Sequence, residues 1–330
     1  MRIFYDSRWI APHGIGRVAR EYRARLVRDF DVIELETGPK PSGPLDWWFL
    51  GRAFRQSGAG LLFTPGYNGT PLAGHRQLFI IHDLIHFGAR EPNGRRKRLY
   101  YNSITRLAAR RGSVLTVSHA SARELEHRWP EVRGRIGVVP NGISEPFRSM
   151  AGDSAGRSGL VLFGNGRWHK NLDGMIAGIA RWQERNGNIP VTIIGPDEPA
   201  RSLADKAGLR APVFAGRLDD AEVAALLARS AALLFCSHAE GFGLPILEAI
   251  ACRCPVIASD IAVMREVGLT GCVFVDPASA EDIAGGIEVA LGETVDETAR
   301  KELVAAHDWD AGYAIIAERL RALAGMSGQH

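Results

Sequence analysis

The sequence predicts an α/β protein with two parallel, doubly wound sheets. Short apolar runs rich in β-branched and aromatic residues alternate with helical patterns along the chain. The alternation stops once, at a polar, glycine-rich stretch at residues 149–158, and then starts again. The length of 330 residues fits two domains of ~150 residues each. These observations together predict two domains of the same kind, joined near the middle of the chain.

The first half contains six candidate strands separated by helical or loop segments. They span residues 2–5, 32–35, 61–64, 78–82, 114–118 and 137–139. Short apolar runs bounded by glycine, proline and polar residues are typical of strands in a buried parallel sheet. We therefore expect a first domain at residues 1–150.

Six more candidate strands follow the polar stretch. They span residues 160–163, 191–194, 213–215, 233–236, 256–259 and 273–275. After Trp309, residues 311–323 have apolar positions at helical spacing. We expect a second domain at residues 151–308, with residues 149–158 as the linker, and a terminal helix within residues 309–330.

The charge is unevenly divided between the two halves. Residues 1–150 contain 24 Lys and Arg against 13 Asp and Glu, whereas residues 151–330 contain 16 against 24. The stretch at 90–111 has eight basic residues and one acidic residue, Glu91, and residues 45–55 interleave aromatic residues with arginine. This composition suits contact with an anionic membrane face, but it fits equally well a solvated basic helix beside aromatic residues of the core. The acidic second half and the absence of a recognition motif argue against nucleic acid as the partner.

The segment E-G-F-G-L-P-I-L-E at residues 240–248 places two carboxylates around a Gly-x-Gly turn. It lies between an apolar strand and a helical run, so Glu240 should lie on the strand-to-helix loop. Gly241 and Gly243 let backbone N–H groups approach an anion, and the helix N-terminus favours phosphate. Glu248, about one turn into the helix, can accept hydrogen bonds from vicinal hydroxyls of a ribose. The alternative is that Glu240 caps the helix and that Glu248 is a solvated surface charge.

This motif resembles the E-x7-E signature of retaining glycosyltransferase family 4, whose members have the GT-B fold. Four further segments carry the resemblance: G-N-G-R-W-H-K-N-L at 164–172, H-D-L-I at 82–85, V-S at 117–118 and V-P-N-G-I at 139–143. The resemblance implies two Rossmann-like domains that face each other across a cleft. It also implies an acceptor-binding first domain, a nucleotide-sugar-binding second domain, and a C-terminal helix that packs back on the first domain.

The resemblance also implies roles for residues of the second domain. Lys170 and Arg167 would stabilise the diphosphate leaving group, because preorganised cations act where negative charge develops. Arg167 departs in spacing from the arginine that the family commonly presents before this lysine. Glu240 would hold the hydroxyls of the donor sugar and its oxocarbenium-like transition state, and Glu248 the ribose. The backbone amides that would complete the donor cradle are those of Phe242, Gly243 and Leu244.

In the first domain, the resemblance places His82 beside the donor sugar and the acceptor, at the carboxyl end of a strand where α/β sheets bind ligands. The segment H-G-I-G-R-V-A at 13–19 would be the glycine loop, with Gly14 and Gly16 near the donor diphosphate. The same segment matches G-x-G-x-x-A, the fingerprint of a nicotinamide oxidoreductase. In that fold the first glycine follows the strand directly, whereas here residues 6–13 intervene.

We expect neither a metal nor another cofactor. His82 and His86 form H-x3-H, but the pattern lacks the helix and the glutamate of a zinc protease motif. The D-W-D segment at 308–310 matches the D-x-D motif that binds a divalent cation in another glycosyltransferase fold. Its position before the final helix makes Asp310 a candidate N-cap instead.

The cysteines lie at positions 236, 252, 254 and 272, without the paired C-x2-C spacing of a zinc site. We expect reduced, buried thiols and a cytoplasmic protein. The N-terminus enters a strand directly, so we expect no secretory leader.

The sequence thus predicts a retaining, metal-independent glycosyltransferase that moves a hexose from a nucleotide sugar to a saccharide or lipid-linked acceptor, in the cytoplasm or peripherally on the inner face of the cytoplasmic membrane. Bacterial family members with a similar H-D-L-I segment are often mannosyltransferases of polysaccharide or lipopolysaccharide biosynthesis, which favours GDP-mannose as the donor. UDP-glucose and other donors stay open, as do an NAD-dependent oxidoreductase, a GT-B epimerase or phosphorylase, and a catalytically silent nucleotide-sugar-binding protein.

Overall fold

The computed structural model describes residues 1–12, 14–88, 94–150, 156–268 and 271–327. The chain divides into two compact units, the first comprising Met1–Gly142 and Asp308–His330 and the second Ile143–His307. The division falls between Gly142 and Ile143, before the polar stretch, in which residues 151–155 lie outside the described residues.

The first unit is built around a six-stranded parallel sheet with the order β2-β1-β3-β4-β5-β6. Its strands are β1 (Arg2–Tyr5), β2 (Asp31–Glu34), β3 (Leu61–Thr64), β4 (Gln77–Ile81), β5 (Ser113–Thr116) and β6 (Ile136–Val138). Its helices are α1 (Gly14–Asp29), α2 (Asp46–Ser57), α3 (Gly94–Tyr100), α4 (Arg106–Arg111), α5 (His119–Arg128) and α14 (Trp309–Ser327), and a π-helical turn, Tyr101–Thr105, joins α3 to α4. All six strands predicted for this half are present, within one or two residues of the expected bounds.

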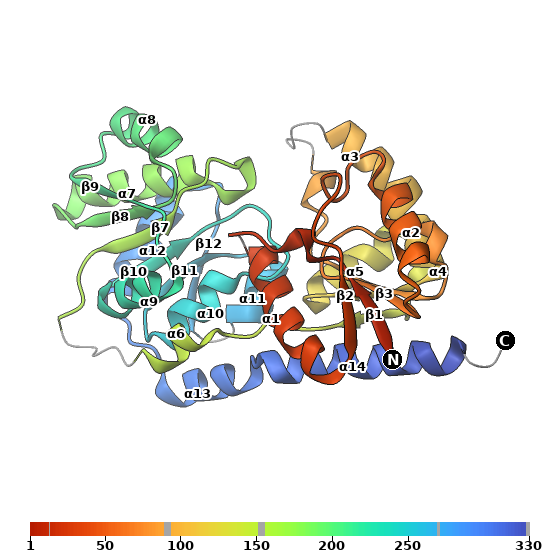
Figure 1. Cartoon of the computed structure of the whole chain (residues 1–330). Helices are drawn as coiled ribbons and strands as arrows, with labels where there is room; N and C mark the ends of the chain where they lie inside the picture. The colour runs from red at the N-terminus through yellow and green to blue at the C-terminus, as the bar shows by residue number, and fades with distance from the viewer. Residues whose placement is uncertain (13, 89–93, 151–155, 269–270, 328–330) are drawn as a thin grey trace. The chain divides into compact units, whose positions relative to one another are not determined.

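The start of the C-terminal helix α14 packs against the C-terminal half of α1 in the first unit (Figure 1). The Trp309 indole packs edge-on against Tyr22 at 5.5 Å, and the Tyr313 hydroxyl donates to the Asp29 carboxylate at 2.7 Å. The Asp310 carboxylate accepts from Arg25 on α1 at 2.8 Å. The prediction that Asp310 caps α14 is wrong, because the carboxylate of Asp308 accepts from the first amides of the helix instead.

The second unit contains another six-stranded parallel sheet, with the order β12-β11-β10-β7-β8-β9. Its strands are β7 (Leu160–Phe163), β8 (Val191–Ile194), β9 (Pro212–Gly216), β10 (Ala232–Phe235), β11 (Val256–Ser259) and β12 (Cys272–Val275). Its helices are α6 (Glu145–Ser149), α7 (Leu172–Asn186), α8 (Asp197–Ala207), α9 (Asp220–Arg229), α10 (Leu244–Ala251), α11 (Ala262–Gly268), α12 (Ala280–Leu291) and α13 (Glu297–Ala306).

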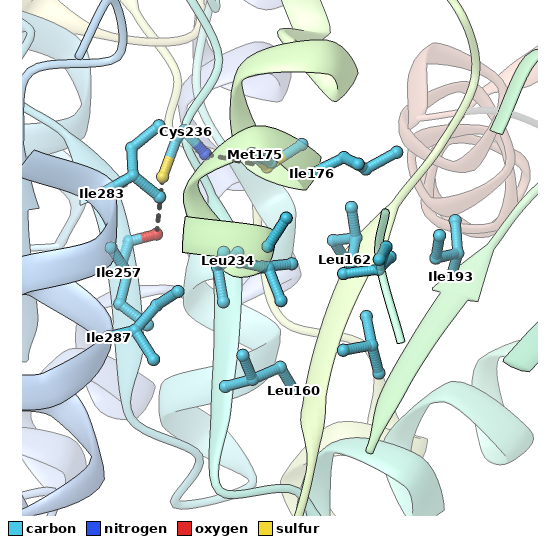
Figure 2. Close-up of a cluster of buried hydrophobic side chains, with 14 of the residues drawn as sticks. Leu160, Leu162, Met175, Ile176, Ile193, Leu234, Cys236, Ile257, Ile283 and Ile287 are labelled. Atoms are coloured by element: carbon cyan, nitrogen blue, oxygen red, sulfur yellow. Dashed lines mark hydrogen bonds between the residues drawn. The ribbon is translucent and has the colours of Figure 1, made fainter. Parts of the chain in front are cut away.

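Helices α7 and α12 cover one face of the second sheet with apolar side chains. Figure 2 shows Leu160, Leu162 and Leu234 of the sheet beside Met175 of α7 and Ile283 of α12. All five side chains are almost completely buried. Burial of this apolar surface fixes the sheet, and with it the loops at the carboxyl ends of the strands.

The cysteines follow the expectation with one exception. Cys236, Cys252 and Cys254 are free and buried, whereas Cys272 is only partly buried. Burial raises the pKa of the Cys236 thiol to about 12, so this side chain remains a neutral thiol at physiological pH.

Each sheet has one point at which the strand order reverses. In the first sheet it lies between β1 and β3, and in the second between β7 and β10. Ligands of open parallel α/β sheets bind beyond the carboxyl ends of the strands at such a point. A functional site is therefore expected among the residues that follow β1, β3, β7 and β10.

Candidate functional site

Lys170 and Glu240 meet at the reversal point of the second sheet. Lys170 follows β7 and Glu240 follows β10, and the Lys170 Nζ lies 2.6 Å from the Glu240 Oε1. The side chains are 20% and 11% exposed, respectively. The Lys170 ammonium also lies 5.1 Å from the centre of the Phe235 ring. A cation and a carboxylate thus lie together, mostly shielded from water but still accessible.

Hydrogen bonds fix the loops that carry this pair. The Asn171 side chain donates to the Cys236 carbonyl at 2.8 Å and to the Pro277 carbonyl at 2.7 Å, so it joins the segments after β7, β10 and β12. The backbone N–H of His238 donates to the His169 carbonyl at 2.7 Å. Because Asn171 adopts a left-handed conformation with a φ of 52°, the chain can end the short turn Trp168–Lys170 and begin α7 at once. Lys170 therefore lies in the turn before α7 and not in the helix itself.

Glu240 does not cap α10. The N-cap of that helix is Gly243, with a φ of 110°, and no side chain caps it. Glu240 instead pairs with Lys170. The alternative in which Glu240 serves only as a helix cap is therefore wrong.

Glu248 lies within α10 and is only 4% exposed. The alternative of a solvated surface charge is therefore wrong for this residue too. A carboxylate at such a position requires polar partners. Phe242, with 6% exposure, packs against the His307 ring at 5.9 Å, and Leu244 is the first residue of α10. The backbone of Phe242, Gly243 and Leu244 therefore forms the entry to this helix, where backbone N–H groups have no partner within the helix.

Arg167 lies at the N-cap of the turn that contains Lys170. Its side chain is exposed, and its backbone N–H donates to the Asn165 side chain at 3.2 Å. The turn thus places Arg167 three residues before Lys170, with its guanidinium at the surface of the second unit.

In the first unit, Gly14 and Gly16 are in the first turn of α1, so the predicted glycine loop is partly helical. Gly14 is exposed and Gly16 is buried. A Cβ at position 16 would lie 1.9 Å from the Ala11 carbonyl oxygen, so only glycine fits there. His13, the first residue of the predicted segment, lies outside the described residues.

His82 lies directly after β4 and is 6% exposed. Its Nε2 is 2.7 Å from the Pro65 carbonyl oxygen. Because that oxygen can only accept, Nε2 carries a proton. The Tyr67 ring lies 5.6 Å from His82 and 5.3 Å from His86, and the Tyr67 hydroxyl donates to the Asp83 carboxylate. The two histidines therefore flank a tyrosine. Within the part of the chain that the structure describes, no group of three or more His, Cys, Asp or Glu could hold a metal ion.

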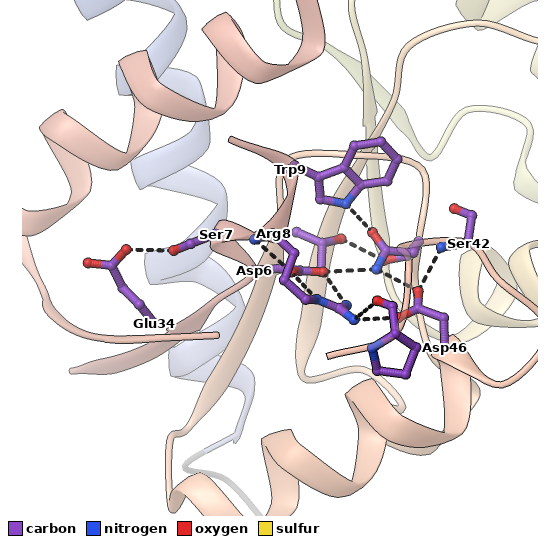
Figure 3. Close-up of polar contacts among 10 residues, drawn as sticks. Asp6, Ser7, Arg8, Trp9, Glu34, Ser42 and Asp46 are labelled. Atoms are coloured by element: carbon purple, nitrogen blue, oxygen red, sulfur yellow. Dashed lines mark hydrogen bonds and ion pairs between the residues drawn. The ribbon is translucent and has the colours of Figure 1, made fainter. Parts of the chain in front are cut away.

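Sequence reasoning missed a set of polar residues at the reversal point of the first sheet. Asp6 and Arg8 follow β1, Asn68 follows β3, and Asp46 begins α2 (Figure 3). The Asp6, Asp46 and Asn68 residues are completely buried. Their position shortly after strands or at a helix start was the available signal. Because these residues are far apart along the chain, the sequence does not show that they contact one another.

Comparisons with known proteins agree with this architecture. Residues 155–305 match the protein family described as Glycosyl transferases group 1. The glycogen synthase of Mycobacterium tuberculosis is 30% identical over 213 residues, which cover 60% of this chain and 51% of that protein. The chain thus spans about half the length of this relative. The O-antigen chain mannosyltransferase RfbU of Salmonella typhimurium is 26% identical over 245 residues, which cover 71% of this chain and 67% of that protein.

Among solved structures, the sucrose-phosphate synthase of Thermosynechococcus elongatus superposes with a TM-score of 0.77 at 18% identity, covering 98% of both chains. At that identity the likeness establishes the fold. Residues 155–305, which make up most of the second unit, thus match the glycosyl transferases group 1 family, in a chain whose two α/β units have the fold of GT-B glycosyltransferases.

Proposed function

We propose that this protein is a retaining glycosyltransferase that moves a hexose from a nucleoside diphosphate sugar to a saccharide acceptor without a metal ion. The observation that carries the proposal is the Lys170–Glu240 pair at the reversal point of the sheet within the group 1 domain. Transfer breaks the bond between the sugar and the phosphate, and the electron pair leaves with the nucleoside diphosphate. A cation held near that bond stabilises the charge that develops there.

In this proposal, the second unit binds the donor. The Lys170 ammonium and the more exposed Arg167 guanidinium neutralise the diphosphate. Glu240, which holds Lys170 before the donor arrives, then accepts hydrogen bonds from the sugar hydroxyls and supports the oxocarbenium-like transition state. Glu248 accepts hydrogen bonds from the ribose hydroxyls, as an acidic residue does in dinucleotide-binding folds. The amides of Phe242, Gly243 and Leu244 complete the cradle.

The first unit would bind the acceptor. Gly14 and Gly16 begin α1, whose N-terminus favours a negatively charged group. His82, directly after β4, would lie beside the sugar.

Mannose from GDP-mannose is the donor that we favour, because the relative RfbU is named as an O-antigen chain mannosyltransferase. UDP-glucose is the second candidate, and the similarity to a glycogen synthase supports it. A nicotinamide oxidoreductase is less well supported. Its phosphate-binding glycine should end β1 directly, whereas Gly14 is separated from that strand by the segment 6–13.

The acceptor that we propose is linked to a lipid in an anionic membrane surface, at the inner face of the cytoplasmic membrane. Leu99, Leu45 and Trp48 are 71%, 70% and 47% exposed, respectively, in a unit with a large excess of basic residues. Exposed apolar side chains beside basic ones favour a membrane interface. Arg90 and Glu91 of the predicted basic stretch lie outside the described residues. In the part that the structure describes, no helix is long and apolar enough to span a bilayer.

A donor screen tests the proposal. The protein is mixed with nucleotide sugars, including GDP-mannose and UDP-glucose, and thermal shift is recorded. Release of nucleoside diphosphate is then measured with and without an extract of lipid-linked acceptors. We expect one donor to raise the melting temperature and release of its nucleotide to increase with the acceptor extract. A stabilising nucleotide sugar without any turnover would instead identify a binding protein. Stabilisation by NAD but by no nucleotide sugar would favour an oxidoreductase.

A further inference from the structure

A buried ionic cluster lies at the reversal point of the first sheet, beyond the carboxyl ends of β1 and β3 (Figure 3). The Arg8 side chain is 4% exposed, and those of Asp6 and Asp46 are completely buried. Arg8 donates from Nε and Nη2 to the two carboxylate oxygens of Asp6, each at 2.7 Å, and from Nη1 to Asp46 at 2.8 Å. A second bond from Nη1 reaches the Pro39 carbonyl at 2.9 Å.

Asn68 links the cluster to the loop after β3. Its Nδ2 donates to Asp6 and to Asp46, each at 2.9 Å. Its Oδ1 accepts from the Trp9 Nε1–H at 2.6 Å. Because one side-chain amide uses both its donors and its acceptor, its orientation is fixed, and so is the indole that it holds.

The Trp9 ring is held on a second side by backbone. A Cβ at position 66 would lie 2.1 Å from Cε2 of the indole, so the ring lies directly against Gly66. The Tyr67 ring lies 5.9 Å from it. Trp9 as a residue is partly buried. With its N–H satisfied by Asn68, the remaining surface of the indole is apolar.

The cluster is a costly way to stabilise a fold. Burial of charges carries a desolvation penalty, and a well-packed apolar group of the same volume often gives equal or greater stability. Burial also raises the pKa of the Asp46 carboxyl, although Arg8 lies beside it. The arrangement gives Trp9 a defined orientation. Residues that do not touch a ligand often hold the residues that do in this way.

We propose that Trp9 is a stacking residue for the sugar ring of the acceptor, and that Arg8, Asp6, Asp46 and Asn68 are positioning residues that orient it. A pyranose presents an apolar face of C–H groups and a rim of hydroxyls, which matches a partly buried tryptophan whose neighbour Tyr67 lies next to a histidine. Tyr67 connects the two, since its ring lies 5.9 Å from Trp9 and 5.6 Å from His82. This inference rests on the proposed glycosyl transfer, because it assigns the saccharide to the acceptor.

Saturation-transfer difference NMR tests the stacking without enzyme activity. The probes are methyl α-D-mannopyranoside and methyl α-D-glucopyranoside, each with the full-length protein. We expect saturation of the ring C–H protons of at least one glycoside, and its loss in Trp9→Ala. Gly66→Ala should also weaken the signal, because the added methyl group displaces the indole. The Trp9→Phe variant should keep part of the saturation signal, whereas Trp182→Phe in the second unit should keep all of it. The absence of any signal with the unaltered protein, or an equal signal in Trp9→Ala, would overturn the inference.

Kinetics distinguish this inference from the proposed function. With the same glycosides as acceptors, Trp9→Ala should raise the acceptor KM by about tenfold, the loss of one aromatic contact of ordinary strength. The kcat of transfer at saturating acceptor should change less than the KM, because the proposed contact is with the acceptor. Arg8→Met should raise the acceptor KM similarly, and Arg8→Lys less, because lysine keeps the charge but not the two-pronged contact with Asp6. If the unaltered protein releases no nucleotide from any donor, the proposed function fails, while the NMR result still stands. If transfer proceeds with the same acceptor KM in Trp9→Ala, only the stacking proposal fails.

Discussion

The Lys170 ammonium and the Glu240 carboxylate form an ion pair of 2.6 Å, although the two residues are 70 positions apart in the sequence. The pair joins the loops after β7 and β10, the strands between which the second sheet reverses its order. Each charge is therefore neutralised by the other. A bound diphosphate would give Lys170 a second anion, and Glu240 would then be available for sugar hydroxyls. Since the two residues touch, their effects on activity should not be additive.

The first prediction concerns Lys170. Lys170→Ala should lower turnover on the order of 10²-fold, as loss of a single group that stabilises transition-state charge does in other enzymes. The measurement is the steady-state rate of nucleotide release with the donor found in the screen. Lys206→Ala is the matched control, because Lys206 is an exposed lysine of α8 in the same unit. Equal rates for the two variants would remove Lys170 from the mechanism.

The second prediction separates the two glutamates. Glu248→Ala should weaken binding of the bare nucleoside diphosphate by roughly 1–3 kcal/mol, the cost of unmet buried polar partners. Glu240→Ala should lower turnover more than nucleotide affinity, because its proposed contacts are with the sugar. Calorimetry with the nucleoside diphosphate measures the first effect and initial rates the second, with exposed Glu302→Ala as the control. Equal losses of affinity in the two variants would contradict this assignment of roles.

The sequence predicted all twelve strands because each is an apolar run between polar or glycine-containing segments. Its placement of the domain boundary differs from the division of the structure. The polar residues 149–158 suggested a linker, but the preceding helix α6 already belongs to the second unit. Phe147 of α6 is completely buried, and its carbonyl accepts from the thiol of Cys252, the C-cap of α10. A single buried aromatic residue in a short helix is too weak a signal to place a boundary.

The candidate site of the second unit was predictable where a local motif marked its residues, as with Glu240 and Lys170. The Arg8 cluster was not, because Asp6 and Asn68 are 62 positions apart and neither lies in a recognisable motif. Hydrogen bonds between distant side chains depend on the tertiary fold, so a local pattern does not reveal them. For the same reason, the sequence did not reveal that Trp9 is anchored by Asn68.

The third prediction concerns metal ions. If Lys170 and Arg167 neutralise the diphosphate, activity should survive an excess of EDTA. The assay is nucleotide release before and after chelation, with a known Mg²⁺-dependent transferase treated in parallel. Complete loss of activity on chelation, restored by Mg²⁺ or Mn²⁺, would contradict the proposed mechanism.

The fourth prediction concerns the membrane. Arg95, Arg96, Lys97 and Arg98 form one basic segment in α3, followed by the exposed Leu99. A basic residue near an anionic surface contributes ~1 kcal/mol, so replacement of all four by serine should reduce binding to anionic vesicles by orders of magnitude. High salt should have the same effect on the unaltered protein, because it screens these charges.

Vesicle co-sedimentation measures this binding at low and high salt, and vesicles of neutral lipid are the control. Activity on a soluble glycoside should change little in the four-serine variant. If the unaltered protein does not pellet with anionic vesicles at low salt, α3 is a solvated basic helix and the lipid-linked acceptor loses its support.

The fifth prediction concerns acid stability and a contact between α7 and α12. Glu281 of α12 accepts hydrogen bonds from Arg185 and Arg181 of α7, and these bonds lower the pKa of its carboxyl to about 2. A carboxyl group whose pKa is lower in the folded chain than in the unfolded chain stabilises the fold. This stabilisation is present at pH values above the pKa in the unfolded chain, ~4.3. This contribution should therefore fall as the pH is lowered from about 5 toward 2. Because the three side chains are about half exposed, the effect should be small and should weaken with salt.

Glu281→Gln tests this sign directly. The variant should have a lower melting temperature than the unaltered protein at pH 7. The difference should shrink as the pH approaches 2, because the Glu281 carboxyl of the unaltered protein then becomes protonated and, like the glutamine amide, carries no charge. Thermal melts from pH 7 to the lowest pH at which the protein still folds give the comparison. Glu293→Gln, an exposed position just beyond the end of α12, serves as the control. A difference that stays constant or grows on acidification would show that the Glu281 contact does not stabilise the fold through its charge.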